Sequence, residues 1–107
     1  MTNAGAAVTP TIPTIEEASQ PVLPRYARLQ FDKARDRWVL LVPERVMVPD
    51  DTAVEILQQC DGKRTMADII DALAEKYVTD RPQIAADVVE MIQDLANRGF
   101  VTDAREE

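Results

Sequence analysis

Hydrophobic positions in the second half of the chain recur at helical spacing. Residues 50–98 contain three stretches whose apolar side chains stand three or four positions apart, the spacing that places them on one face of an α-helix. The pattern therefore predicts three amphipathic helices. Their expected inner faces are Ala53, Ile56, Leu57 and Cys60 in the first, Met66, Ile69, Ile70, Leu73 and Tyr77 in the second, and Ile84, Val88, Met91, Ile92 and Leu95 in the third.

Residues that favour helix ends stand at the borders of these stretches. Thr65 and Asp68 have the spacing of a capping box, in which each side chain bonds the other residue's amide. Asp80 is the expected cap of the third helix. For the first helix several caps remain open: Thr52 in a capping box with Glu55, or Asp50, or Asp51.

Two glycines are placed to end helices. Gly62 follows the first stretch, and Gly99 follows the third. Glycine enters the left-handed conformation without the steric cost that a Cβ atom imposes. We therefore expect Gly99 just past the third helix, with Phe100 packing back on Leu95 as in a Schellman motif.

The residues before the predicted helices have the polar and apolar pattern of β-strands. Residues 26–31 alternate between polar and apolar positions, residues 37–42 form a second apolar run, and residues 45–48 form a third, very short one. These runs predict a small three-stranded antiparallel sheet with residues 45–48 at an exposed edge. The fold class is then α+β, with the sheet followed by three helices, in a layout like that of a winged helix-turn-helix domain.

The two ends of the chain lack such periodicity. Residues 1–24 hold four of the seven prolines and only two charged residues, a composition that does not offset the entropy of ordering. We expect residues 1–24 to be a disordered, proline-rich tail or linker, residues 25–102 to form the domain, and residues 103–107 to be a disordered acidic tail.

Composition excludes several kinds of chemistry. The chain has no His, one Cys and one Ser, so it lacks the parts of a Ser-His or Cys-His nucleophile pair and of the usual metal sites. We expect no catalytic residues, no cofactor and no metal, and a protein that is not an enzyme. A lone cysteine, no secretion signal and no membrane-length apolar run favour the cytoplasm.

The distribution of charged residues indicates which kind of partner the protein can bind. Residues 50–98 carry eleven carboxylates against five Lys or Arg, whereas residues 25–48 carry six basic and three acidic residues. Winged helices often bind DNA, but so acidic a helical half would be repelled by phosphate. We therefore expect a peptide-binding domain that contacts neither nucleic acid nor membrane. The alternatives are a winged-helix DNA-binding regulator and a structural interaction module of a larger polypeptide.

Several short motifs resemble the PqqD family of pyrroloquinoline quinone (PQQ) biosynthesis. The resemblance covers roughly residues 25–102, and its most specific part is the Cys-Asp-Gly-Lys-Arg-Thr segment at 60–65. The family often has Gly where this chain has Arg45, and Leu-Asn where it has Pro49-Asp50-Asp51 ahead of Thr52. Other matching positions are Pro43-Glu44, Thr52-Ala53 with Ile56-Leu57, Asp87-Val88, and Leu95 with Gly99-Phe100-Val101.

The resemblance implies a RiPP recognition element, a domain that holds a ribosomally made precursor peptide. Such a chain would bind the precursor PqqA and present it to the radical S-adenosylmethionine enzyme PqqE. Fusions to the PqqC oxidase occur in the family, so this chain could be fused or adjacent to PqqC. In related domains the peptide joins the sheet edge and lies against the third helix. The expected peptide-binding residues are Arg45, Val46, Met47 and Val48 on the edge strand, and Ala85, Ala86, Val89 and Gln93 on the helix.

Overall fold

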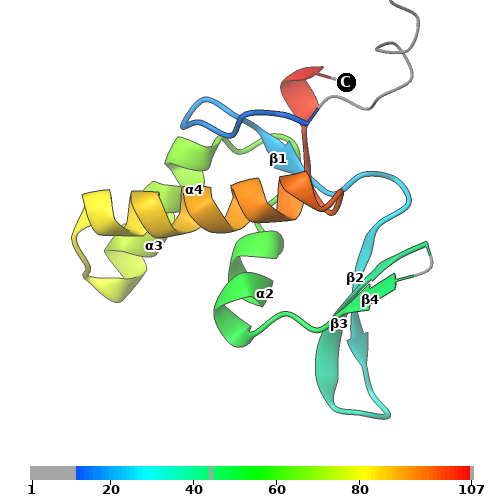
Figure 1. Ribbon diagram of the computed structural model, residues 1–107. Coiled ribbons are helices and arrows are strands. Elements are labelled where there is room, and N and C mark those ends of the chain that lie inside the picture. Colours follow the sequence, from blue (N-terminus) through cyan, green and yellow to red (C-terminus); the bar gives the residue numbers. More distant parts are fainter. Residues whose placement is uncertain (1–11, 44, 107) are drawn as a thin grey trace, which may run out of the picture.

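The structure, a computed structural model, describes residues 12–43 and 45–106 (Figure 1). In this part of the chain two small sheets flank a group of helices, and α3 and α4 pack against each other. None of the described helices is long and apolar enough to cross a membrane. In chain order the elements are β1 (Pro21–Val22), β2 (Arg28–Asp32), β3 (Arg37–Val42), β4 (Arg45–Met47), α2 (Asp51–Leu57), α3 (Met66–Tyr77), α4 (Arg81–Asn97), β5 (Thr102–Asp103) and the 3-10 helix η1 (Ala104–Glu106).

The larger sheet is antiparallel with the strand order β2-β3-β4, which confirms the predicted three-stranded antiparallel sheet. Leu40 pairs with Leu29 on one side and with Met47 on the other, so apolar side chains share one face. Leu40 is fully buried, whereas Leu29 and Met47 pack against the core from its margin. Beyond them, Phe31 and Trp38 form an edge-to-face aromatic pair with ring centroids 5.6 Å apart.

The helix starts follow the capping chemistry of the sequence. Asp50 caps α2, because its carboxylate accepts a hydrogen bond of 2.8 Å from the Ala53 amide. Of the alternatives for this helix, Asp50 is therefore the cap and Thr52 is not. Thr65 and Asp68 form the predicted capping box of α3. Asp80 occupies the cap position of α4 without a side-chain hydrogen bond to the helix.

The end of α4 is the predicted Schellman motif. Gly99 has a φ of +84°, and the Phe100 amide donates to the Leu95 carbonyl at 2.9 Å while the Gly99 amide donates to the Ala96 carbonyl at 3.1 Å. The chain thus turns sharply back on the helix. Phe100 and Val101 are consequently buried in the core.

The core lies between the larger sheet and the three helices. Burial of an isoleucine or leucine side chain contributes about 1.5–3 kcal/mol to the free energy of unfolding. Three residues expected in the core lie outside it: Tyr77 is exposed, and Ile84 and Met91 are half-buried. The fully buried apolar side chains of the larger sheet, the helices and the turn after α4 are Leu40, Met66, Ile69, Ile70, Ile92 and Phe100.

The expectation of a disordered segment before residue 25 differs from the structure over residues 12–24, while residues 1–11 lie outside the described part. Residues 12–20, here called the strap, cross the start of α3 and place Ile15 in the core. Their carbonyls accept hydrogen bonds from the first amides of α3, with Ser19 bonding Met66 at 2.8 Å and Glu17 bonding Ala67 at 2.9 Å. A helix leaves its first amides without partners inside the helix, so the strap satisfies them.

The other terminal segment also belongs to the domain. Strand β1 follows the strap and pairs antiparallel with β5, so that Pro21 lies opposite Asp103. Gly62, with a φ of +78°, donates its amide to the Pro21 carbonyl at 3.0 Å, and a Cβ there would come within 3.2 Å of Val22. Ordered structure continues past the boundary expected at residue 102, since Asp103 is fully buried and β5 is followed by η1.

Candidate functional site

Strand β4 presents a free edge. It is the last strand of the described sheet, bonded to β3 on one side alone. Val46 is 65% exposed and Val48 is exposed just past the end of the strand. The amide and carbonyl groups on the outer side of such a strand can pair with an extended peptide. The structure thus places the predicted residues Arg45–Val48 at an accessible sheet edge.

An apolar pocket opens directly after this strand. It has a volume of about 230 Å³ and lies between the start of α2, the end of α3 and the middle of α4. We call it the α2–α4 pocket. Tyr77, Ile84 and Met91, three residues that the sequence pattern assigned to the core, instead line its wall. Its full lining is Asp50, Thr52, Ile56, Leu73, Tyr77, Ile84, Asp87, Val88 and Met91.

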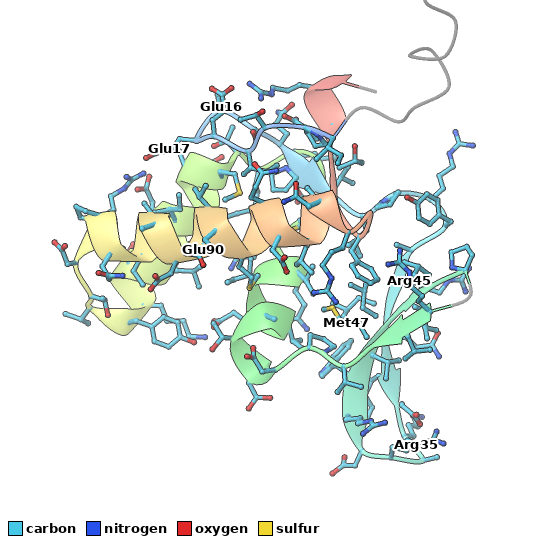
Figure 2. All side chains as sticks on the ribbon, in the orientation of Figure 1. Glu16, Glu17, Arg35, Arg45, Met47 and Glu90 are labelled. Atoms are coloured by element: carbon cyan, nitrogen blue, oxygen red, sulfur yellow. The ribbon has the colours of Figure 1, made fainter. Side chains whose placement is uncertain are left out.

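A second, shallower hollow of about 980 Å³ runs over the outer face of α4. Small and apolar side chains form part of its lining, and Glu90 stands on this exposed face (Figure 2). The predicted residues Ala85, Ala86, Val89 and Gln93 all belong to this hollow, together with Asp87, Met91, Asp94 and Asn97.

The residues that line this hollow lie on two sides of α4. An α-helix turns 100° per residue, so Ala85, Val89 and Gln93 share one flank, and Asp87, Met91 and Asp94 share the opposite one. The second flank is the one next to β4, since Asp87 and Met91 line the α2–α4 pocket with Asp50 and Thr52. We call it the β4-facing flank. Sequence reasoning missed it because Met91 was assigned to the core.

Gln93 is bonded to the strap. Its side-chain oxygen accepts the Ile15 amide at 2.8 Å, and its side-chain nitrogen donates to the Pro13 carbonyl at 3.0 Å. The same nitrogen also lies 3.0 Å from the Asn97 side-chain oxygen. The residue predicted to contact a peptide thus already binds an extended segment of its own chain. Val89 and Ala85 pack against the core beside it, half-buried.

Arg45 reaches from the edge strand to the end of α4. Its guanidinium donates to the Arg98 carbonyl at 2.9 Å and lies 4.8 Å above the centroid of the Phe100 ring. Tyr26 makes a parallel contact, because its hydroxyl donates to the next carbonyl, that of Gly99, at 3.1 Å. Figure 2 shows Arg45 and Met47 on the side of the molecule where the sheet approaches this helix end.

Carboxylates line the outer face of α4. Asp87 accepts a hydrogen bond from Gln83 at 3.0 Å, and Asp94 pairs with Arg98 at 3.2 Å. Exposed pairs of this kind contribute about 0–1 kcal/mol, so they shape the charge of the surface more than its stability. A helix with this face would be repelled by DNA phosphates, which weighs against the DNA-binding alternative.

The described residues include no group of three or more His, Cys, Asp or Glu side chains that could hold a metal ion. Cys60 is buried beside α2, and its thiol lies 3.4 Å from the Ile56 carbonyl. Burial, together with the neighbouring Asp61 carboxylate, raises the pKa of this thiol to about 12. Such a thiol stays protonated at neutral pH and behaves as a small apolar side chain.

The family model of Coenzyme PQQ synthesis protein D (PqqD) matches residues 37–101 of this chain. The chain belongs to the PqqD family. The matched region runs from β3 to the turn after α4 and so contains the edge strand, the α2–α4 pocket and both flanks of α4. The resemblance expected from the short motifs is thereby confirmed.

Named relatives of this PqqD-family chain point the same way. A PqqA binding protein of Rhodopseudomonas palustris (strain BisB5) is 62% identical over 93 residues, which cover 87% of this chain and 91% of the relative. A PqqA binding protein of Xanthomonas euvesicatoria pv. vesicatoria (strain 85-10) is 48% identical over 81 residues, covering 76% and 88%.

A solved structure shares the fold. The solution NMR structure of the PqqD truncation of Methylobacterium extorquens PqqCD, described as a functional and stand-alone RiPP recognition element, superposes with a TM-score of 0.70. It is 38% identical in sequence, and the match covers 82% of this chain and 94% of that one. The predicted fold class, a three-stranded antiparallel sheet followed by three helices, is confirmed.

Proposed function

We propose that this chain is a peptide chaperone of PQQ biosynthesis that binds the precursor peptide PqqA and presents it to the radical S-adenosylmethionine enzyme PqqE. The observation that carries the proposal is the free edge of β4 beside an apolar pocket, in a chain 62% identical to a PqqA binding protein. Catalysis on the peptide then belongs to PqqE, and this chain supplies binding and orientation.

The peptide joins the sheet as an additional strand next to β4. Backbone hydrogen bonds to the strand edge supply affinity that depends little on sequence, whereas neighbouring side chains supply selectivity. Val46 and Val48 are both exposed there. A side chain of the peptide strand would lie within contact distance of its cross-strand neighbour on β4.

The same peptide lies against the β4-facing flank of α4. The α2–α4 pocket, about 230 Å³ in volume and largely apolar in its lining, has room for one large apolar side chain of the peptide. Met91 lies on the wall of this pocket and also in the hollow over α4, so a peptide that fills the pocket continues along the helix. We therefore shift the helix contribution from the predicted set Ala85, Ala86, Val89 and Gln93 to Asp87, Met91 and Asp94.

The test is a titration of isotopically labelled protein with the PqqA peptide, following each backbone amide. We expect shifts at residues 45–48 and on the β4-facing flank, with small shifts at Gln93 and in the strap. A well-dispersed spectrum that stays unchanged would reject PqqA as the partner. Shifts centred on Ala85, Val89 and Gln93 would instead restore the helix residues predicted from the sequence.

A matched pair of variants sharpens the test. Val46→Asp removes an apolar contact beside the peptide strand. The affinity for the peptide should fall about tenfold, somewhat more than the loss of one cross-strand contact alone would cause. Val78→Asp makes the same change at a side chain that is 91% exposed after α3, in a left-handed conformation that Asp tolerates. It should leave the affinity unchanged, and equal effects of the two variants would count against the β4 edge.

Presentation to PqqE needs its own measurement. In a reconstituted reaction, PqqE should modify PqqA faster when this chain is present, and Val46→Asp should reduce that gain. If the wild-type chain binds PqqA but does not change the rate of the PqqE reaction, it is a peptide-binding protein and not a chaperone.

A further inference from the structure

Arg45 lies between the two walls of the proposed peptide site. It belongs to the edge strand β4, and its exposed side chain reaches across to α4, where it donates a hydrogen bond of 2.9 Å to the Arg98 carbonyl. Arg98 is the last, capping residue of that helix. The carbonyls at a helix end lack partners inside the helix and carry its partial negative charge, so a guanidinium is well suited to bind there.

The guanidinium of Arg45 also lies over the ring of Phe100. Phe100 is buried, and the Arg45 guanidinium carbon lies 4.8 Å from its ring centroid. The Arg98 guanidinium approaches the same ring at 5.3 Å. A planar guanidinium can stack on the ring and donate sideways at the same time, which a lysine ammonium cannot do.

The side chains of Arg45 and Tyr26 both reach Gly99, the residue after the helix cap. Gly99 follows Arg98, and a Cβ atom on it would lie 3.7 Å from the Arg45 guanidinium and 4.0 Å from the Tyr26 hydroxyl. Tyr26 donates to the Gly99 carbonyl from the segment just before β2. Two donors from the sheet side thus hold two successive carbonyls of the turn after α4.

We propose that Arg45 is a positioning residue that ties the edge strand β4 to the end of α4 and thereby fixes the separation of the two walls between which the peptide lies. It was predicted to contact the peptide directly. The geometry assigns its donor to the protein's own backbone instead. The tie closes the site at the Arg98 end, so the peptide leaves it at the opposite end, past Asp50 and the α2–α4 pocket. The expected effect on peptide binding rests on the proposed function, whereas the tie between Arg45 and α4 does not.

The test combines structure and affinity on the full chain. Residual dipolar couplings of backbone amides report the orientation of α4 relative to the strands β2–β4 in the free protein, and the PqqA titration reports affinity. Arg45→Ala should change this relative orientation and weaken PqqA binding about tenfold, the size expected for one lost charge-assisted hydrogen bond. The set of amides shifted by the peptide should stay the same.

Three further variants separate the causes. Arg45→Lys keeps the charge but cannot both stack and donate sideways, so it should restore only part of the affinity. Tyr26→Phe removes the weaker, neutral hydrogen bond and should have a smaller effect. Arg28→Ala removes another exposed arginine of the same sheet, located on the far strand β2, and should change neither measurement.

Each other outcome overturns the inference. Wild-type couplings in Arg45→Ala with lost affinity would make Arg45 a direct peptide contact. Unchanged affinity of Arg45→Ala for PqqA would show that the tie does not affect the peptide site. If wild-type protein binds no PqqA, the proposed function fails, while the couplings of Arg45→Ala still decide whether the tie exists.

Discussion

The Gln93 side-chain oxygen accepts a hydrogen bond from the Ile15 amide, while its side-chain nitrogen donates to the Pro13 carbonyl. An amide that accepts from one residue and donates to the residue two positions earlier makes the same pair of contacts as an adjacent β-strand. The strap is thereby fixed along one flank of α4. The opposite flank remains for a partner.

Gln93→Ala should loosen the strap. Loss of two hydrogen bonds to half-buried backbone groups should lower the free energy of unfolding by about 1–3 kcal/mol, and amide exchange at Ile15 should speed up. Chemical denaturation and hydrogen exchange measure the two effects. Gln83→Ala is the control, since Gln83 bonds only the exposed Asp87 side chain on the same helix. Unaltered exchange at Ile15 would show that Gln93 does not hold the strap.

Ile15→Ala should destabilise the whole domain. The Ile15 side chain is 5% exposed within the core, and truncation of a buried isoleucine costs about 2–5 kcal/mol. Ile12→Ala makes the same change in the same strap at a side chain that is 54% exposed, where the cost should stay within about 0.5 kcal/mol. Urea unfolding of both variants checks the contrast. Similar, small losses of unfolding free energy in both variants would mean that the strap does not belong to the folded unit.

Asp103 should make the domain sensitive to acid. Burial alone would raise its pKa, but hydrogen bonds from Arg105 and from the Gln20 amide outweigh burial and lower the pKa from 3.8 to about 2. A pKa lowered by folding stabilises the protein above the unfolded value, and this stabilisation is lost as the pH falls from about 4 to 2. It amounts to about 2 kcal/mol at neutral pH.

Asp103→Asn isolates this contribution. The difference in unfolding free energy between wild type and variant should be constant above pH 5 and should shrink steadily between pH 4 and pH 2. Urea titrations across this range measure it. Parallel curves down to pH 2 would mean that Asp103 has an ordinary pKa in the folded protein.

Cys60 should resist thiol reagents until the domain unfolds. Its pKa of about 12 leaves almost no thiolate at pH 8, and its side chain is buried. Iodoacetamide should label it slowly in the native protein and rapidly in urea, with the half-point of labelling at the unfolding midpoint. Fast labelling without denaturant would reveal local opening around α2.

The helices and the larger sheet could be predicted because their signals are local. Thr65 and Asp68 form the capping box that their spacing indicates, and Gly99 ends α4 in the left-handed conformation that glycine favours. The alternation of residues 26–31 and the apolar run at residues 37–42 match the pairing of β2 with β3, although β2 begins only at Arg28. Each of these features depends on residues a few positions apart.

The strap could not be predicted because its partners are distant in sequence. Residues 12–20 have no periodicity, and Ile15 bonds a residue 78 positions away. The only apolar signal beyond one alanine was a pair of isolated isoleucines, Ile12 and Ile15, among polar residues and a proline, which also occur in disordered chains. For the same reason the sequence placed Gln93 correctly on α4 but could not show that the strap occupies it. The β4-facing flank was missed because spacing alone does not separate a core residue from a pocket wall, as at Met91.

The pairing of β1 with β5 also decides how the domain can be attached to other polypeptides. Pro21 and Asp103 lie opposite each other, at a separation of about 5 Å as in any antiparallel pair. The β2–β3 turn is at the far end of the molecule (Figure 1). The chain therefore enters β1 and leaves β5 on the same side of the molecule. A circular permutant that joins residue 106 to residue 12 through a flexible linker and opens the chain at Lys33–Asp36 should keep its peptide site intact.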